Sequence, residues 1–206
     1  NSQAITLVYV DSTKGWINVQ NAEDTETGTS FVTATGGTIT ECGNYKIHTF
    51  TGPGTFCVSA ISTTPAENTI DYLVVAGGAA GGGTAPFGGT NGAGGGAGGV
   101  RFFASPANPQ GGPAAPRNAP AGIPITVTGF PITVGAGGAA SGDSGNNGNP
   151  SIFSTITSTG GGGGGSANSP LSPVEYGRPG GSGGGQTGGP TGNFGAGNTP
   201  PVSPPQ

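Results

Sequence analysis

Charge is scarce in this 206-residue chain, where only 7% of the residues are Asp, Glu, Lys or Arg. The chain has no Met, one Trp and three Leu, and no segment shows the 3.6-residue apolar period of an amphipathic helix. The five basic residues are scattered and the net charge is −4, which speaks against a nucleic-acid partner, because phosphate contacts need clustered Lys and Arg. No apolar run approaches the ~20 residues of a membrane span. We therefore expect an all-β chain with essentially no α-helix, no nucleic-acid partner and no membrane insertion.

Glycine and proline are abundant, with 47 Gly and 19 Pro. Only seven of the glycines precede residue 70, so the chain has two parts of different composition. Such a density usually signals disorder, since little apolar surface is left to offset backbone entropy. The glycine-rich part nevertheless contains the apolar runs IDYLVV, VRFF, IPITVTGFPITV and SIFSTI, whose β-branched and aromatic content is typical of strands. We expect an ordered architecture.

Three regions follow from these patterns. Residues 1–27 predict a β hairpin, ITLVYV and WINVQ around the turn DSTKG, followed by a linker. Alternation places apolar side chains on both faces of this hairpin, so one face could pack against a neighbouring chain. Residues 28–69 predict a small antiparallel β domain with strands in SFVTAT, GTITEC, GNYKIHTF and GTFCVSAI, and residues 70–206 predict a glycine-rich domain. The strand-like start NSQAITLVYV suggests a processed product or a fragment of a longer protein.

From residue 71 a pattern of strand, glycine tract and loop repeats, in DYLVVAGGAAGGG, NGAGGGAGGVRFF, PITVGAGGAASG, STITSTGGGGGG and GGSGGGQTGG. A phosphate-binding loop would need a helix after its glycines. Here the prolines at 106 and 109 follow VRFF so closely that they would end a helix before it begins. Glycine tracts can instead adopt the three-residue polyproline II helix and hydrogen bond to one another. A flexible linker is the simpler alternative, and the interleaved strands weigh against it. We expect polyglycine II-like tracts that carry Pro-rich display loops between them.

Several motifs in this part are similar to a known group of proteins. The run NYKIHTFTGPGTF followed by DYLVVAGG, GAGGGAGGVR, ITVGAGG and SIFSTITSTGGGGGG resembles the Gly-rich C-terminal region of phage tail-fibre proteins, and LVYVDSTKGWINVQN resembles the β segment that leads into it. The resemblance implies a virion structural protein, usually a homotrimeric fibre. It implies contact with other fibre or tail proteins and with a host cell-surface receptor, for which a glycan is one class. No functional residue is carried over from it.

Motifs for catalysis and metal binding are weak. His48, Asp71 and Ser144 follow the chain order of a chymotrypsin-like triad, but a triad is recognised by geometry, and a glycine-rich half would not build that fold. Asp143 and the asparagines of DSGNNGNP could suggest a calcium-binding loop. The segment lacks the closing Glu of such a loop, so a tight polar turn accounts for it better. We expect no enzymatic activity, no cofactor and no metal.

The two cysteines, Cys42 and Cys57, lie in neighbouring predicted strands. A disulfide and two thiols both remain open, because the sequence does not supply the Cα separation that decides between them.

Exposed aromatic and arginine side chains on Pro-rich loops are common anchors for binding. The candidates for receptor binding are Phe87, Arg117, Tyr176, Arg178 and Phe194. Tyr and Arg would suit stacking against sugar rings or bidentate bonding to acidic glycans, whereas Phe87 and Phe194 could instead be core residues between glycine layers. The sequence thus favours a distal or docking segment of a phage tail fibre in the virion. The alternative is a subunit of an extracellular glycine-rich filament that assembles by strand addition.

Overall fold

The computed structural model describes residues 6–18, 30–83, 92–105, 117–141, 144–166, 176–187 and 194–206. The strands are β1 (Leu7–Tyr9), β2 (Trp16–Asn18), β3 (Thr33–Thr35), β4 (Thr38–Cys42), β5 (Tyr45–Thr49), β6 (Gly54–Ala60), β7 (Thr69–Ile70), β8 (Tyr72–Val75), β9 (Val100–Phe103), β10 (Ile123–Pro124), β11 (Gly129–Thr133), β12 (Ser151–Phe153) and β13 (Ile156–Ser158). The only helical element within the described ranges is a 3₁₀ turn, Pro65–Glu67. The all-β prediction is confirmed.

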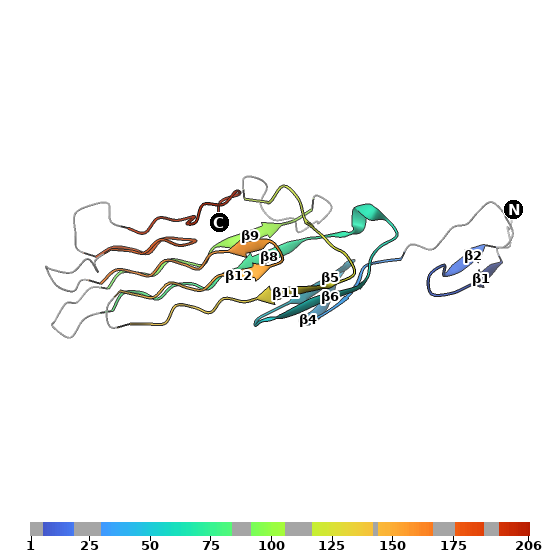
Figure 1. Cartoon of the computed structure of the whole chain (residues 1–206), viewed down its shortest axis with the longest axis horizontal. Coiled ribbons are helices and arrows are strands. Elements are labelled where there is room, and N and C mark those ends of the chain that lie inside the picture. The colour runs from blue at the N-terminus through green and yellow to red at the C-terminus, as the bar shows by residue number, and fades with distance from the viewer. Residues whose placement is uncertain are drawn as a thin grey trace.

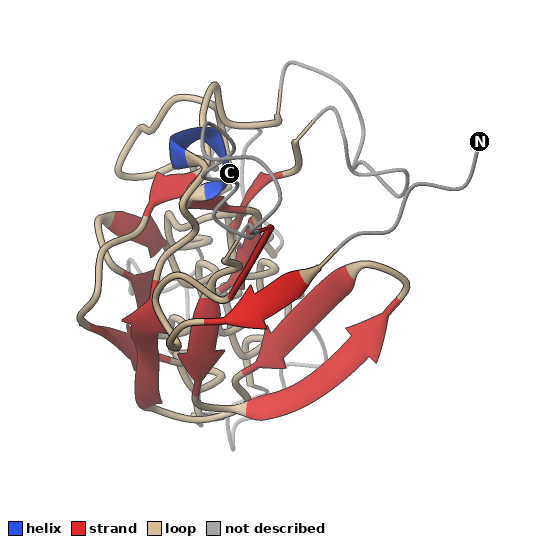
Figure 2. Cartoon of the chain, turned by 90° about the vertical axis from the view of Figure 1, so that its right-hand side faces the viewer, coloured by secondary structure: helices blue, strands red, loops and turns tan. Residues whose placement is uncertain are grey.

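The largest sheet has five antiparallel strands in the order β13-β12-β11-β6-β3. Four two-stranded sheets accompany it: β1–β2, β4–β5, β7–β10 and β8–β9. Strands from both sides of the boundary expected at residues 69/70 share the five-stranded sheet, because β3 and β6 precede it and β11, β12 and β13 follow it. Figure 2, viewed from the right-hand side of Figure 1, shows these strands in front of the glycine-rich loops.

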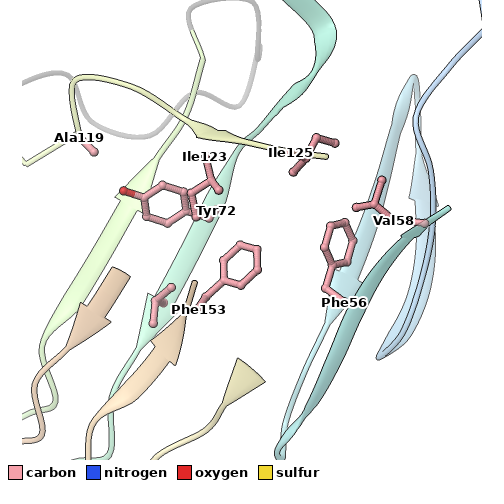
Figure 3. Close-up of a cluster of buried hydrophobic side chains, with 9 residues drawn as sticks. Phe56, Val58, Tyr72, Ala119, Ile123, Ile125 and Phe153 are labelled. Atoms are coloured by element: carbon pink, nitrogen blue, oxygen red, sulfur yellow. The ribbon is translucent and has the colours of Figure 1, made fainter. Parts of the chain in front are cut away.

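The hydrophobic core lies between the five-stranded sheet and the β8–β9 sheet, which contacts β12 and β13. Phe56 of β6, Phe130 of β11 and Phe153 of β12 form an aromatic cluster with centroid separations of 6.1–6.3 Å. Tyr72 and Val74 enter this core from β8, and Figure 3 shows Tyr72 and Phe153 among its buried side chains. Burial raises the pKa of the Tyr72 hydroxyl, partly offset by Arg101. Strands β8, β9, β11, β12 and β13 of this core adjoin glycine-rich segments of the chain.

A sharp bend separates β3 from the β4–β5 hairpin. Gly36 and Gly37 have φ of +110° and +64°, conformations that side chains disfavour. A Cβ on Gly36 would also lie 2.1 Å from the carbonyl oxygen of Thr55. The bend is held by His48, whose Nδ1 lies 2.8 Å from the Gly36 carbonyl oxygen and whose ring packs edge-on against Phe56 at 5.0 Å.

The N-terminal hairpin β1–β2 is closed by a polar turn, as predicted. The carboxylate of Asp11 accepts hydrogen bonds from the backbone N–H groups of Thr13 (2.8 Å) and Lys14 (2.7 Å). These bonds hold the pKa of Asp11 below its usual value. Tyr9 and Trp16, which face each other across the strands, make an edge-to-face ring contact at 5.5 Å.

Glycine-rich tracts run side by side away from the strands (Figure 1). Their ranges are 76–83, 92–99, 134–141, 144–150, 159–166, 177–187 and 194–199, numbered here as tracts 1 to 7. Tract 6 reverses direction at residues 180–182, so that its two limbs lie beside each other and Gly184 donates to the carbonyl of Arg178. Bonds between tracts 1 and 2 recur at every third residue, where the N–H groups of Ala76, Ala79 and Gly82 donate to the carbonyls of Gly99, Gly96 and Ala93. The same spacing of three joins tract 5 to its neighbours. The tracts therefore have the three-residue turn and inter-tract bonding expected of polyglycine II.

Tract 5 is the centre of this bundle, and its residues 160–166 are all buried. The N–H groups of Gly161 and Gly164 donate to tract 1, and those of Gly162 and Gly165 donate to tract 6. Gly163 donates instead to the side-chain oxygen of Asn147 in tract 4, at 2.8 Å. Carbonyls of tract 5 accept bonds from tracts 2, 4 and 6. Each N–H from 161 to 165 has an acceptor, as a buried backbone requires.

The central glycines lie too close to neighbouring backbones for any side chain. A Cβ on Gly161 would lie 2.0 Å from the carbonyl oxygen of Gly96, and one on Gly164 would lie 2.1 Å from that of Ala93. In glycine a Cα–H bond takes this direction, so each of these residues directs a hydrogen at a carbonyl oxygen. By contrast, a Cβ on Gly94, in tract 2, would meet nothing within 4 Å. A side chain is thus excluded at these central glycines and tolerated at Gly94.

The C-terminal residues are bonded to the bundle. Gly195 of tract 7 donates to the carbonyl of Gly184 in tract 6 at 2.9 Å. The side chain of Gln206 accepts a 2.8 Å bond from the N–H of Thr159, where tract 5 begins. The segment therefore packs on the bundle because it satisfies backbone groups that the other tracts leave open.

Candidate functional site

Two of the predicted binding residues, Tyr176 and Phe194, stand directly before tracts 6 and 7. Each is followed by a glycine that contacts the carbonyl oxygen of Gly184: Gly195 donates to it, and a Cβ on Gly177 would lie 1.9 Å from it. The two aromatic residues are therefore fixed near the same point of the bundle. Tyr176 is 46% exposed and Phe194 is 70% exposed, so the interpretation of Phe194 as a core residue is wrong.

Arg178 lies beside these residues and is bonded through both its backbone and its side chain. Its N–H donates to the carbonyl of Gly163 at 2.8 Å, and its carbonyl accepts from Gly184 at 2.9 Å. Its guanidinium donates to the hydroxyl of Ser144 at 2.9 Å. A guanidinium has five N–H donors, so it can bind a ligand while it holds Ser144. We call Tyr176, Arg178 and Phe194 the aromatic–arginine surface.

This surface lies in the outer half of the bundle, away from the strands. Arg178 bonds to the middle of tract 5, and Gly185, next to Gly184, donates to the carbonyl of Gly94. Rings held on a hydrogen-bonded backbone lose little entropy when a ligand stacks on them. The arrangement can offer aromatic faces and a fixed cation to a ligand.

The other two predicted residues do not join this surface. Arg117 is exposed and precedes Asn118, whose side chain bonds both backbone groups of Ala104 at 2.9 and 3.0 Å. Because Ala104 directly follows β9, Arg117 lies near the strand end of the molecule. Phe87 lies outside the described residues.

The residues of the weak catalytic and metal motifs make structural contacts. The Nδ1 of His48 contacts the Gly36 carbonyl, while the hydroxyl of Ser144 accepts from Arg178. Asn146 and Asn147 direct side-chain bonds to Ala139 and to tracts 5 and 6, and Asp143 lies outside the described residues. Within the part of the chain that the structure describes, no group of three or more His, Cys, Asp or Glu could hold a metal.

Both cysteines are free thiols and exposed. Cys42 ends β4 beside the turn of the β4–β5 hairpin, whereas Cys57 lies within β6, opposite Gly129 and Thr35. No disulfide joins Cys42 to Cys57 in this structure.

The sequence reasoning missed one structural segment near the site. Residues 144–150, predicted as a polar turn, form tract 4, in which Gly145 and Gly148 donate to the carbonyls of Gly164 and Gly161. The three-residue spacing of these two glycines could have predicted a tract. The asparagines around them make the segment look like a polar turn instead.

None of the described helical segments is long and apolar enough to span a membrane. A family model described as a glycine-rich domain matches residues 51–203. No curated protein and no solved structure matches the chain significantly.

Proposed function

We propose that this member of the glycine-rich domain family, to which the match over residues 51–203 assigns it, is a non-enzymatic structural segment of a phage tail fibre, because its motifs resemble those of tail-fibre proteins. In this proposal it forms the distal or docking part of the fibre in the virion, as a homotrimer that contacts other fibre or tail proteins. Its task is attachment to a receptor on the host cell surface, and it needs no cofactor.

The observation that carries the proposal is the pair of exposed rings on a backbone that glycines hold in place. Tyr176 and Phe194 each adjoin a glycine that contacts Gly184, and both rings are open to solvent. Exposed aromatic residues beside an arginine are frequent anchors of recognition. A hydrogen-bonded glycine bundle suits this task because it supports such anchors without side chains of its own.

The test is binding of fluorescently labelled protein to a panel of bacterial strains. We expect the wild-type protein to bind to at least one strain. The double variant Tyr176→Ala/Phe194→Ala should bind to that strain at least 10-fold more weakly, since aromatic anchors contribute about 2 kcal/mol or more each. Phe31→Ala is the matched control, because Phe31 is 72% exposed and lies beside β3. Unchanged binding by the double variant, or binding to no strain, would contradict the attachment role.

A second candidate function is a subunit of an extracellular glycine-rich filament that assembles by strand addition. The N-terminal hairpin favours it, since Leu7, Tyr9 and Trp16 are 52–61% exposed. Electron microscopy distinguishes the two candidates. A closed threefold particle, labelled on phage tails by antiserum against this chain, supports the tail fibre, and an open helical repeat supports the filament.

A further inference from the structure

The β8–β9 sheet exposes an apolar face. Its register places Leu73 opposite Phe102 and Val75 opposite Val100, so these four side chains share the side that faces away from the core. Leu73 is 68% exposed, Val75 52% and Val100 39%. We call these four residues the outer face of β8–β9. It holds aliphatic and aromatic side chains where an antiparallel sheet normally presents polar ones.

The other layer of the same core shows the usual pattern and serves as an internal comparison. The outward-facing residues of its strands β6 and β11 include Thr55, Ser59 and Thr133, which are exposed. The five-stranded sheet therefore presents polar residues on its outward side, whereas the β8–β9 sheet presents apolar ones. A contiguous apolar surface of this kind is typical of an interaction site.

The N-terminal hairpin is a second apolar element without cover. Leu7, Tyr9 and Trp16 lie on one of its faces, as the pairing of Tyr9 with Trp16 shows, and they are 52%, 53% and 61% exposed. A two-stranded hairpin alone is only marginally stable in water. It therefore gains stability from packing against another surface.

We propose that the outer face of β8–β9 is the docking surface for the N-terminal hairpin of a second copy of this chain. A hairpin-to-hairpin contact would leave the β8–β9 face exposed, and a face-to-face contact would leave the hairpin exposed. A single hairpin-to-face contact covers both. This inference rests on the self-assembly in the proposed function and not on its receptor binding.

Charge and chain length fit this contact. The charged residues of the hairpin, Asp11 and Lys14, lie in its turn, and the guanidinium of Arg101 in β9 donates to the carbonyl of Ser203 at 3.4 Å. The four residues of the outer face are themselves uncharged, so docking does not need to desolvate an ion. The 11 residues 19–29 join the hairpin to the body, and 11 residues span at most ~40 Å, which allows the hairpin to reach a neighbouring molecule.

A contact between two different surfaces also determines the symmetry. The hairpin of each copy binds the sheet of the next, so the contact is heterologous. It closes into a ring of three if each copy is rotated by a third of a turn, and otherwise continues as an open filament. The same contact could thus build either assembly considered above.

Two double variants test the inference in the full chain. The hairpin variant is Leu7→Thr/Tyr9→Thr, and the face variant is Leu73→Thr/Val75→Thr. All four positions are exposed in strands and threonine is a good strand former, so both variants keep the fold. Light scattering gives the mass over a range of concentrations. The emission of Trp16, the one tryptophan in the chain, reports whether the hairpin is covered.

We expect the wild-type protein to form oligomers with a blue-shifted Trp16 emission, and each variant alone to be monomeric with solvent-like emission. An equimolar mixture of the two variants should form dimers, because an intact hairpin then meets an intact face. The control Ile39→Thr/Ile47→Thr removes other exposed apolar side chains (44% and 45%) from the β4–β5 hairpin and should assemble as wild type.

Three results would overturn the inference. They are a face variant that assembles like wild type, a mixture that stays monomeric, and a wild-type monomer at every concentration, whether or not its own hairpin covers Trp16. Both pairs of substitutions leave Tyr176 and Phe194 intact, so the assembly is measured independently of cell binding.

Discussion

Alanine at Gly164 should destabilise the protein strongly, while alanine at the neighbouring Gly94 should not. A Cβ on Gly164 would lie 2.1 Å from the carbonyl oxygen of Ala93 and 2.8 Å from that of Gly94. Ordinary contacts of a Cβ begin near 3.4 Å, so tracts 2 and 5 must separate by more than an ångström. The clash is with backbone atoms of Ala93 and Gly94, so no rotamer change relieves it.

The cost follows from the bonds that cross this contact. Overpacking of a core costs about 1–3 kcal/mol. Separation of the tracts also stretches the bonds from Ala93 to Gly165 (2.9 Å) and from Gly96 to Gly162 (2.8 Å), each of which contributes about 0.5–1.5 kcal/mol. The sum is about 2–6 kcal/mol, a large share of the 5–15 kcal/mol typical of a whole protein. At roughly 2–4 °C per kcal/mol, Tm should fall by about 10 °C.

The Gly94→Ala variant is the matched control. A Cβ there meets nothing within 4 Å, and its φ is not in the left-handed region. Alanine restricts the unfolded chain more than glycine does, so this variant should be unchanged or up to about 1 kcal/mol more stable. Calorimetry and denaturant midpoints measure both variants. Equal stabilities for Gly164→Ala and wild type would refute the close-packed bundle.

Two further substitutions probe side chains that complete the backbone network. Asn147→Ala leaves the buried N–H of Gly163 without its 2.8 Å acceptor and should cost about 1–3 kcal/mol in chemical denaturation, whereas Asn146→Ala, whose amide makes an exposed bond, should change stability by no more than about 0.5 kcal/mol. Gln206→Ala removes the 2.8 Å acceptor of the Thr159 N–H, so hydrogen exchange at Thr159 should become faster; unchanged exchange would show that the C-terminal residue does not protect this site.

Turn chemistry made much of the strand pattern predictable. The glycines at 36, 37 and 43 punctuate short β-branched runs, and β3, β4, β5 and β6 appear where those runs lie. The sequence also indicated that glycine tracts bond to one another, because the repeated strands made a flexible linker improbable. These predictions depended on local features that a single segment carries.

The parts that were not predictable depend on which tracts become neighbours. Tract 4 contains few glycines, yet it lies against tract 5 because Gly145 and Gly148 recur with the three-residue period and Asn147 substitutes for a carbonyl. Arg178 was expected only as a surface anchor, but its carbonyl accepts from Gly184 inside the bundle. Neither role is visible in a linear pattern, since both arise from the packing of distant segments.

The bundle separates stability from surface chemistry, and this bears on the proposed role in attachment. In an ordinary domain the side chains that form the core also restrict which surface residues are tolerated. In tract 5 the contacts are backbone to backbone apart from the bond to the Asn147 side chain, so its stability depends mainly on close approach at its glycines and on the three-residue repeat. Residues that adjoin the tracts, such as Tyr176 and Phe194, can then change without loss of the interior bonds. A receptor-binding protein under pressure to alter its contacts would benefit from that independence, whereas an enzyme, which needs fixed side chains in a pocket, would not.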